Sequence, residues 1–305
     1  MQISIASGKG GTGKTTVAVN LAAVAARRST GPASGPRVQD AAADRRPGDT
    51  TGETKIQILD CDVEEPNCHI YLRPELTQSV DVEIPVPQVD ESRCTRCGLC
   101  GEVCAFHAIL PGKRVLVFPE LCHGCGACVL ACPRGALYQV DRPVGVIGRG
   151  VAGNAILVEG RLLVGNPNPV PVIHRAIEFG LAEGRDAVID SPPGAACPMV
   201  AAVRQADAVI LVTEPTPFGR ADAEVAAQVL VELGKPTALV VNRSGILEED
   251  PPLGGILGTL PELARISFSR RVAEGYAVGV PPSAVDPSWA MAAESAWRWV
   301  MEVTG

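Results

Sequence analysis

Cysteine placement constrains this chain more than any other feature, because eight of its eleven cysteines fall between residues 94 and 132. They form two runs with the spacing C-x2-C-x2-C-x3-C, and the second run repeats the first 28 residues later, from Cys94 to Cys122. Compact cysteine triplets favour metal clusters, whereas zinc usually takes two separated pairs and an odd count disfavours a disulfide framework. We therefore expect eight metal-ligating residues: Cys94, Cys97, Cys100, Cys104, Cys122, Cys125, Cys128 and Cys132.

A glycine-rich segment near the N-terminus predicts a phosphate site. Residues 8–15 (GKGGTGKT) fit the pattern G-x-x-x-x-G-K-[ST] between a predicted strand at 2–6 and a predicted helix at 14–27. Backbone N–H groups of such a loop surround phosphates at the positive end of the helix, while Lys14 reaches the β- and γ-phosphates and Thr15 ligates Mg²⁺. The expected nucleotide contacts here are Gly8, Gly10, Gly11, Thr12, Gly13, Lys14, Thr15 and Thr16.

Apolar strands alternate with helical segments along the rest of the chain. Further strands are predicted at 55–59, 187–189, 208–212 and 238–241, and helices at 170–183, 198–205, 220–233 and after Asp286. This alternation predicts an α/β fold, a doubly wound and mainly parallel sheet. The cysteine region interrupts it, so we expect three parts: 1–87 and 141–305 form one P-loop domain, and 88–140 is a small inserted α+β domain. Residues 29–54 are polar and Pro-rich, and we expect a mobile surface loop there.

Two acidic segments directly follow predicted strands. Asp62 comes after the second strand, and Asp190 ends the third. Because the carboxyl ends of parallel strands surround the crevice where ligands bind, we expect both carboxylates near the phosphate loop. For a single aspartate at a strand end, capping of a helix is the alternative role.

The loop sequence K-G-G-T-G-K-T, which begins at Lys9, resembles the deviant Walker A motif of the MinD/ParA superfamily, which includes nitrogenase iron protein and Mrp-type proteins. The resemblance implies a homodimer with two ATP molecules between the subunits and Lys9 touching the partner's nucleotide. It likens residues 60–67 to switch I, where Asp62 would orient the attacking water. It likens residues 190–194 to Walker B and switch II, where Asp190 would hold Mg²⁺ through water and the Gly194 N–H would sense the γ-phosphate.

Two later segments resemble base-binding parts of the same superfamily. Asn242, in ALVVNRSG, matches the asparagine that contacts adenine, with a turn asparagine as the alternative. Residues 260–262 (LPE) resemble the segment beside the base.

The cysteine region resembles a bacterial-type ferredoxin with two [4Fe–4S] clusters. In that pattern the fourth cysteine of each run ligates the other cluster. The resemblance thus implies one cluster on Cys94, Cys97, Cys100 and Cys132, and the other on Cys104, Cys122, Cys125 and Cys128. The first run ends Cys-Ala where the second ends Cys-Pro, which affects the surroundings of one cluster rather than its ligands.

Composition excludes several classes of protein. Lys and Arg number 27 against 34 acidic residues, a net charge of −7, so we expect no nucleic-acid partner. No apolar run approaches the ~20 residues that span a bilayer, and the N-terminal residues lack the features of a signal peptide. We therefore expect a cytoplasmic protein that does not insert into membranes.

Together these features predict an ATP-hydrolysing iron–sulfur protein with ATP or ADP and Mg²⁺ as further cofactors. Its ATP-switched dimer would couple nucleotide state to electron transfer or to docking of a redox or cluster-accepting protein. The first alternative is an Mrp-like cluster carrier or assembly scaffold; a MinD- or ParA-like spatial regulator is less favoured.

Buried packing is the default expectation for the remaining cysteines, although Cys197 could pair across a dimer axis. We expect His107 and His123 at the surface. The remaining cysteines are Cys61, Cys68 and Cys197.

Overall fold

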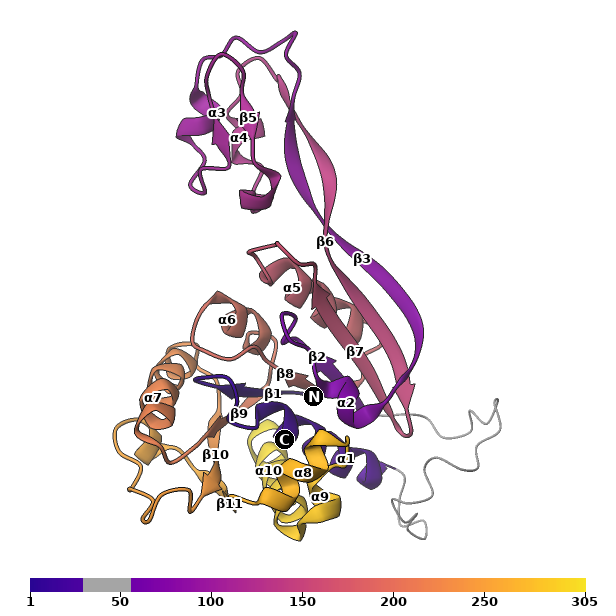
Figure 1. Ribbon diagram of the computed structural model, residues 1–305, viewed down its shortest axis with the longest axis vertical. Helices are drawn as coiled ribbons and strands as arrows, with labels where there is room; N and C mark the ends of the chain where they lie inside the picture. The colour runs from indigo at the N-terminus through magenta and orange to yellow at the C-terminus, as the bar shows by residue number, and fades with distance from the viewer. Residues whose placement is uncertain (30–55) are drawn as a thin grey trace.

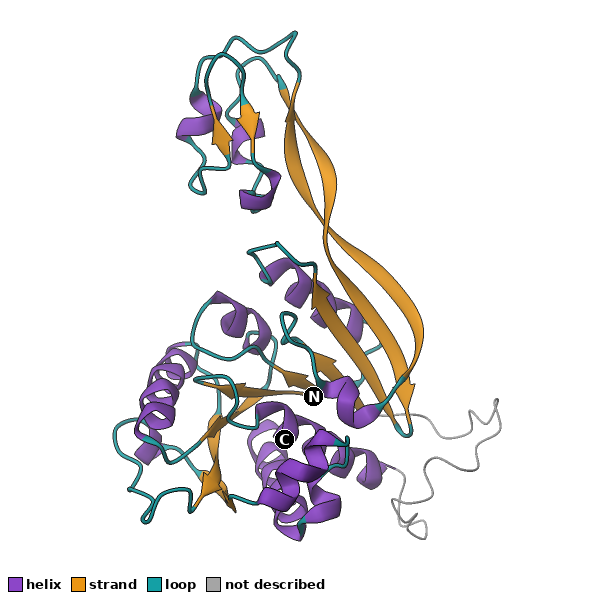
Figure 2. Ribbon diagram, viewed as in Figure 1, coloured by secondary structure: helices purple, strands orange, loops and turns teal. Residues whose placement is uncertain are grey.

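A nine-stranded sheet forms the body of the protein (Figures 1 and 2). The computed structural model describes residues 1–29 and 56–305, and the strand order is β11-β10-β9-β1-β8-β2-β7-β6-β3. The strands of the sheet are β1 (Gln2–Ser7), β2 (Ile56–Asp60), β3 (Glu75–Val89), β6 (Leu137–Ala152), β7 (Ala155–Leu162), β8 (Asp186–Asp190), β9 (Ala208–Thr213), β10 (Thr237–Ser244) and β11 (Glu262–Ser267).

Helices cover both faces of the sheet. On one face α1 and α10 pack on alternate residues of β9, such as Ile210, and on the other face α7 packs on Val209 and Leu211. Every residue of β9 is buried, as expected for a central parallel strand. The doubly wound α/β fold is thereby confirmed. The helices are α1 (Lys14–Ser29), α2 (Cys68–Leu72), α5 (Val170–Leu181), α6 (Cys197–Val203), α7 (Pro217–Glu232), α8 (Arg270–Ala277), α9 (Pro282–Val285) and α10 (Pro287–Thr304), with a 3₁₀ turn at Leu257–Thr259.

A long antiparallel ribbon projects from one edge of the body (Figure 1). It consists of β3 and β6, which pair from Glu75↔Val151 to Val89↔Leu137. β6 pairs with β7 only from Gly145 onward, so the far half of the ribbon has two strands alone. Pro85 and Pro87 lie in β3, the edge strand, where a missing N–H costs no ladder hydrogen bond.

The cysteine region forms a small head at the end of this ribbon (Figure 2). Its core is built from Cys100, Ile109, Val115, Cys128 and Leu137. The helices before the fourth cysteines begin after Gly98 and Gly126, whose φ of 89° and 73° are left-handed. The head contains α3 (Leu99–Glu102), α4 (Ala127–Leu130), a 3₁₀ turn at Pro119–Leu121, and the two-stranded pair β4 (Ile109–Leu110) and β5 (Leu116–Val117).

The structure adds to the large sheet four strands that the sequence pattern did not predict, namely β3, β6, β7 and β11. Prolines and exposed polar residues obscure the alternation in β3, and glycines do so in β6. The ribbon belongs to both parts. We propose that the inserted domain comprises residues 88–140, so that it starts near the end of β3 and ends near the start of β6. Apart from Ser29, which ends α1, the loop expected at 29–54 lies outside the described residues.

Candidate functional site

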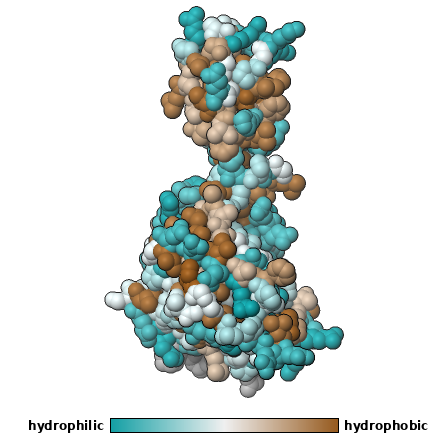
Figure 3. All heavy atoms as spheres, turned by 90° about the vertical axis from the view of Figure 1, so that its left-hand side faces the viewer, coloured by the Kyte–Doolittle hydropathy of each residue, from teal (hydrophilic) through white to brown (hydrophobic). Residues whose placement is uncertain are grey.

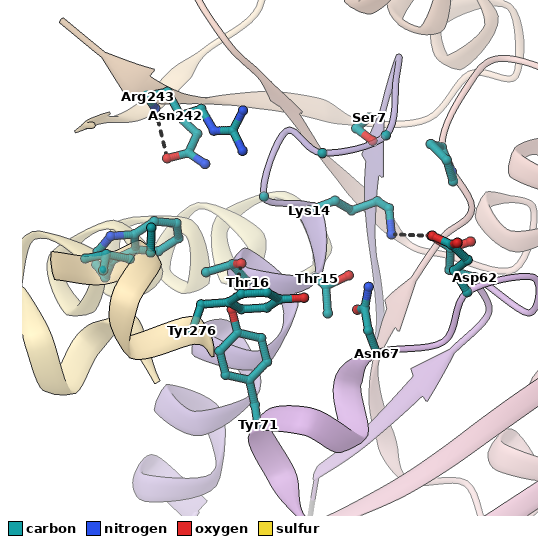
Figure 4. A pocket seen from close by; sticks show the side chains of 18 of the residues that line it. Ser7, Lys14, Thr15, Thr16, Asp62, Asn67, Tyr71, Asn242, Arg243 and Tyr276 are labelled. Carbon is teal, nitrogen blue, oxygen red and sulfur yellow. Dashed lines mark hydrogen bonds and ion pairs between the residues drawn. The ribbon is translucent and has the colours of Figure 1, made fainter. Parts of the chain in front are cut away.

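A pocket of about 680 Å³ opens beside the glycine-rich loop. Figure 4 shows Lys14, Thr15 and Thr16 projecting into it from the start of α1, with Asp62 opposite. Of the predicted nucleotide contacts, these line the pocket: Gly10, Gly11, Gly13, Lys14, Thr15, Thr16 and Asn242. Gly8 instead lies against α7, where a Cβ would collide with the backbone of Asp222.

Buried opposite charges meet at the start of α1. The Lys14 ammonium donates to Asp190 at 2.5 Å and lies 3.6 Å from Asp62, and the Thr15 hydroxyl donates to the other Asp190 oxygen at 2.5 Å. Burial lowers the pKa of Lys14, but the charges of Asp190 and Asp62 more than offset burial and raise it above its usual value. Thr15 and Asp190 are thus adjacent, as a shared Mg²⁺ would require.

Asp60 is a fully buried acid for which the sequence pattern predicts no role of its own. Its side chain accepts the backbone N–H groups of Asn67 and Cys68, both at 2.9 Å, and so shapes the segment that carries Asp62. Burial and the nearby charge of Asp190 raise the pKa of Asp60 to about 8. Burial likewise raises the pKa of Asp62 to about 6, against the opposing effect of Lys14.

Two groups that were expected to contact a nucleotide, the Lys9 ammonium and the Gly194 N–H, bond instead to other groups of the same chain. The Lys9 ammonium donates to Glu214 at 2.6 Å, and Arg243 contacts the other Glu214 oxygen at 3.2 Å. The Gly194 N–H donates to the Ser7 carbonyl at 2.8 Å, so this bond must break before the group can contact a phosphate.

The base end of the pocket differs from the expectation for residues 260–262. That segment precedes and begins β11, whereas the pocket is lined by Ser267, Phe268 and Ser269 at the other end of the strand. The resemblance at residues 260–262 was therefore misleading, because parallel strands place a site only at their carboxyl ends. Asn242 does line the pocket, and its amide donates to the Thr12 carbonyl at 2.7 Å.

Unpartnered polar atoms surround the pocket. Within the described chain, Thr12 Oγ1, Asn67 Oδ1 and Trp289 Nε1 are buried and have no hydrogen-bond partner. Asn67 and Trp289 line the pocket directly, and Thr12 lies within the glycine-rich loop. Since buried polar atoms are rarely left unpaired, these atoms are suited to a polar ligand such as a nucleotide.

The eight clustered cysteines line two separate cavities in the head. The cavity far from the body, which we call distal, is lined by Cys94, Cys97, Cys100 and Cys132. The cavity near the body, which we call proximal, is lined by Cys104, Cys122, Cys125 and Cys128. The two groups are those that the ferredoxin resemblance implies: in each cavity, three cysteines come from one run and the fourth comes from the other run.

The donor set in each cavity fits a [4Fe–4S] cluster. Each cavity presents four thiols, and all eleven cysteines are free of disulfides. Backbone N–H groups point at sulfur: Ala108 N lies 3.3 Å from Cys104 Sγ, Gly124 N 3.4 Å from Cys122 Sγ and Ala136 N 3.2 Å from Cys132 Sγ. Hydrogen bonds of this kind tune the potential of a cluster.

The remaining cysteines divide into two kinds. Cys61 and Cys68 are fully buried, in agreement with their expected packing role, and burial raises the pKa of both thiols. Cys197 is exposed at the start of α6, so the expectation of a buried side chain was wrong there.

His123 links the head to the body. We expected a surface residue there and did not predict this contact. Its ring stacks on Phe106 with centroids 3.6 Å apart, and its Nδ1 lies 3.2 Å from Asn168 Nδ2. Asn168 belongs to the loop between β7 and α5, and its side-chain Oδ1 accepts the Val170 N–H at 3.2 Å. That bond orients the amide so that its NH₂ faces His123 Nδ1. Sequence alone gives no signal for this contact.

Comparisons with known proteins agree with both halves of this site. A model of the 4Fe-4S binding domain matches residues 87–110 and 115–138, and a model of the CobQ/CobB/MinD/ParA nucleotide binding domain matches residues 3–31. The septum site-determining protein MinD from Pyrococcus horikoshii, solved with Mg-ADP, superimposes with a TM-score of 0.57 at 19% identity, over 99% of this chain and 98% of that one. The fold is therefore that of the MinD proteins.

The chain thus combines a nucleotide-binding segment of the CobQ/CobB/MinD/ParA type and the MinD fold with an insertion that carries two 4Fe-4S binding motifs. It is 28% identical to the uncharacterized protein MJ0579 of Methanocaldococcus jannaschii, over 92% of this chain and 90% of the relative. It is 30% identical to MJ0578 of the same organism, over 71% of this chain and 68% of the relative. The chain belongs to the family of these two archaeal proteins. Among its described helices, none is both long and apolar enough to cross a bilayer.

Proposed function

We propose that this protein binds and hydrolyses ATP as a homodimer and uses the nucleotide state to control electron transfer through two [4Fe–4S] clusters. Lys14, Thr15, Asp62 and Asp190 would act on the triphosphate and its Mg²⁺, because phosphoryl transfer needs mainly positioning and charge neutralisation. The clusters would supply one-electron redox chemistry, held by the eight cysteines of the head. Thiols that are all free suit a reducing, cytoplasmic location.

One set of contacts carries the proposal, since it links the segment of Asp62 to the proximal cavity. Val63, the residue after Asp62, accepts the backbone N–H of Leu162 at the end of β7 at 2.8 Å. The chain after Leu162 leads directly to Asn168, which holds His123 between two cysteines of the proximal cavity. Movement of the Asp62 segment can therefore reach the backbone around Cys122 without crossing the rest of the head.

Redox titration of the anaerobic protein, followed by EPR with and without Mg-ATP, tests the coupling. ATP, but not ADP, is expected to shift the potential of one cluster. A shift of about 60 mV would correspond to tenfold coupling for a one-electron couple. N168A is expected to lose the shift while it keeps iron content and ATP affinity.

N166A is the matched control. Asn166 lies in the same loop, but its amide bonds only to the Val144 and Leu163 carbonyls, within the body. N166A is therefore expected to keep the ATP-dependent shift. Cluster potentials that ignore ATP in the unmodified protein would overturn the coupling.

A cluster carrier is the second candidate, because each cavity has one exposed cysteine, Cys97 and Cys125. Exposure of a ligand gives an acceptor protein access to the cluster. Transfer of iron and sulfide to an apo-ferredoxin, faster with ATP than without, would favour the carrier. Clusters that stay with the chain under those conditions would favour electron transfer.

A further inference from the structure

Five basic side chains form a distinct surface at the end of the head farthest from the body. Figure 3 shows hydrophilic side chains gathered at that end. All five are exposed, and within the described residues none makes an ion pair or a side-chain hydrogen bond. The chain as a whole carries a net charge of −7, so the excess of cations is local. We call this set the distal basic surface: Arg93, Arg96, Lys113, Arg114 and Arg134.

The distal basic surface surrounds the distal cavity. Arg96 and Arg134 line that cavity, and Arg114 precedes Val115, which also lines it. The guanidinium of Arg93 lies against Gly135. Carboxylates in the same region are fewer, and that of Asp90 already accepts the N–H and hydroxyl of Ser92. The other two carboxylates are Glu91 and Glu102.

Arg96 adopts a backbone conformation that favours glycine. Its φ is +60°, and the residue at the equivalent place in the second cysteine run is Gly124, with φ +73°. A non-glycine residue in the left-handed region is strained, because its Cβ comes too close to the following carbonyl oxygen. The chain keeps an arginine at the mouth of the distal cavity where glycine would be easier. Strain of this kind is found where a side chain serves a function.

We propose that the distal basic surface is the docking site for an acidic one-electron carrier protein, of the flavodoxin or ferredoxin class. This proposal rests on the proposed redox function and names its partner. Cys94, Cys97, Cys100 and Cys132 would hold the distal cluster. This group would supply the one electron that reduces the oxidised carrier and would itself be oxidised by one electron, with no bond or proton transferred. Unpaired surface cations raise the encounter rate with an acidic partner and align its redox centre with the cavity.

The observations favour a protein over a nucleic acid. The five cations are interspersed with Asp90, Glu91 and Glu102, which would repel a continuous phosphate backbone. Among the described residues, none that lines the distal cavity is aromatic, so bases would find no surface there for stacking. The distal end also projects away from the body, which leaves room for a partner of protein size (Figure 1).

Stopped-flow oxidation of the reduced protein by an acidic flavodoxin tests the proposal. R96G removes a cation and relieves backbone strain, so the variant is expected to be at least as stable as the unmodified protein. Its bimolecular rate at low ionic strength is expected to fall several-fold, and that of R96E/R134E by about tenfold or more. High salt is expected to remove the differences in bimolecular rate between the unmodified protein and the variants, because it screens surface charges.

Two matched controls separate charge from backbone effects. H107G relieves the same kind of strain, because His107 has φ +52° and its repeat partner Gly135 has φ +53°. R298E reverses an exposed arginine on α10 in the body. Both are expected to keep the rate with flavodoxin. With the basic protein cytochrome c as oxidant, R96E/R134E is expected to react no slower than the unmodified protein.

Several outcomes would overturn the docking site. These are an unchanged rate in R96E/R134E, a rate that does not depend on salt, or binding of single-stranded RNA by the unmodified protein that R96E/R134E abolishes. The proposed function fails separately, by cluster potentials that ignore ATP. The reaction with flavodoxin could still depend on charge if the cluster potentials did not change with ATP. The cluster potentials could likewise depend on ATP if the docking site were disproved.

Discussion

At the scale of single residues, three acids surround the buried Lys14 beside the glycine-rich loop. Asp60, Asp62 and Asp190 lie close to one ammonium, and in the proposed function that group would move toward the phosphates of a bound nucleotide. Asp62 is the most accessible of the three acids, with its side chain 17% exposed. It is therefore the acid best placed to contact a water molecule in the pocket.

Hydrolysis of ATP is expected to depend on the charge of Asp62. Burial raises the pKa of this carboxyl to about 6, so it is mostly ionised at pH 7 and becomes protonated as the pH falls through 6. A protonated carboxyl no longer accepts a proton from water, so phosphate release is expected to decline over that range. D62N is expected to be slow at every pH while still binding ATP. E64Q is expected to keep a decline but to move it to lower pH, because the charge of Glu64 also raises the pKa of Asp62. Equal rates for D62N and the unmodified protein would show that Asp62 does not act on water.

At the scale of elements, close packing between β6 and α5 fixes the base of the ribbon. Gly145 begins the pairing of β6 with β7, and Val172 of α5 lies directly over it. α5 begins just after Asn168, so the same packing sets where that side chain meets the head. The packing of α5 on β6 thus positions both the ribbon and the contact between Asn168 and His123.

G145A is expected to destabilise the protein by about 1–3 kcal/mol, since overpacking forces neighbours apart. An added Cβ would collide with Val172 and lie 2.8 Å from the Arg161 carbonyl oxygen. Urea unfolding under anaerobic conditions measures the change. G254A is the control, because a Cβ at Gly254 has no neighbour within 4 Å. A G145A protein as stable as G254A would mean that α5 can shift away without cost.

At the scale of the whole molecule, a broad body and a small head are joined through one ribbon (Figures 1 and 3). The head also meets the body at His123, and it contacts the ribbon through Arg142, whose guanidinium donates to the Pro119 carbonyl at 2.9 Å. The glycine-rich loop remains accessible, since the Lys9 side chain is 32% exposed. A second copy can therefore approach that loop while the distal end of the head stays free.

K9A is expected to abolish ATP-dependent dimerisation. In the single chain Lys9 pairs with Glu214, so it must exchange that partner for the nucleotide of the other subunit. Analytical ultracentrifugation in a D62N background, where ATP persists, measures the assembly. K113A removes an exposed lysine of the head and is expected to dimerise normally. A K9A protein that still dimerises with ATP would exclude a role for Lys9 across the interface.

The sequence alone determined the glycine-rich loop, the two cysteine runs and the alternation of the central strands. Each of these is encoded within a short segment, because a P-loop and a C-x2-C-x2-C turn need only their own backbone geometry. Only the tertiary structure decided that Asp60 lies beside Asp190 and that Asn168 meets His123. Those contacts join residues far apart along the chain, so they depend on sheet order and helix packing, which no local pattern specifies.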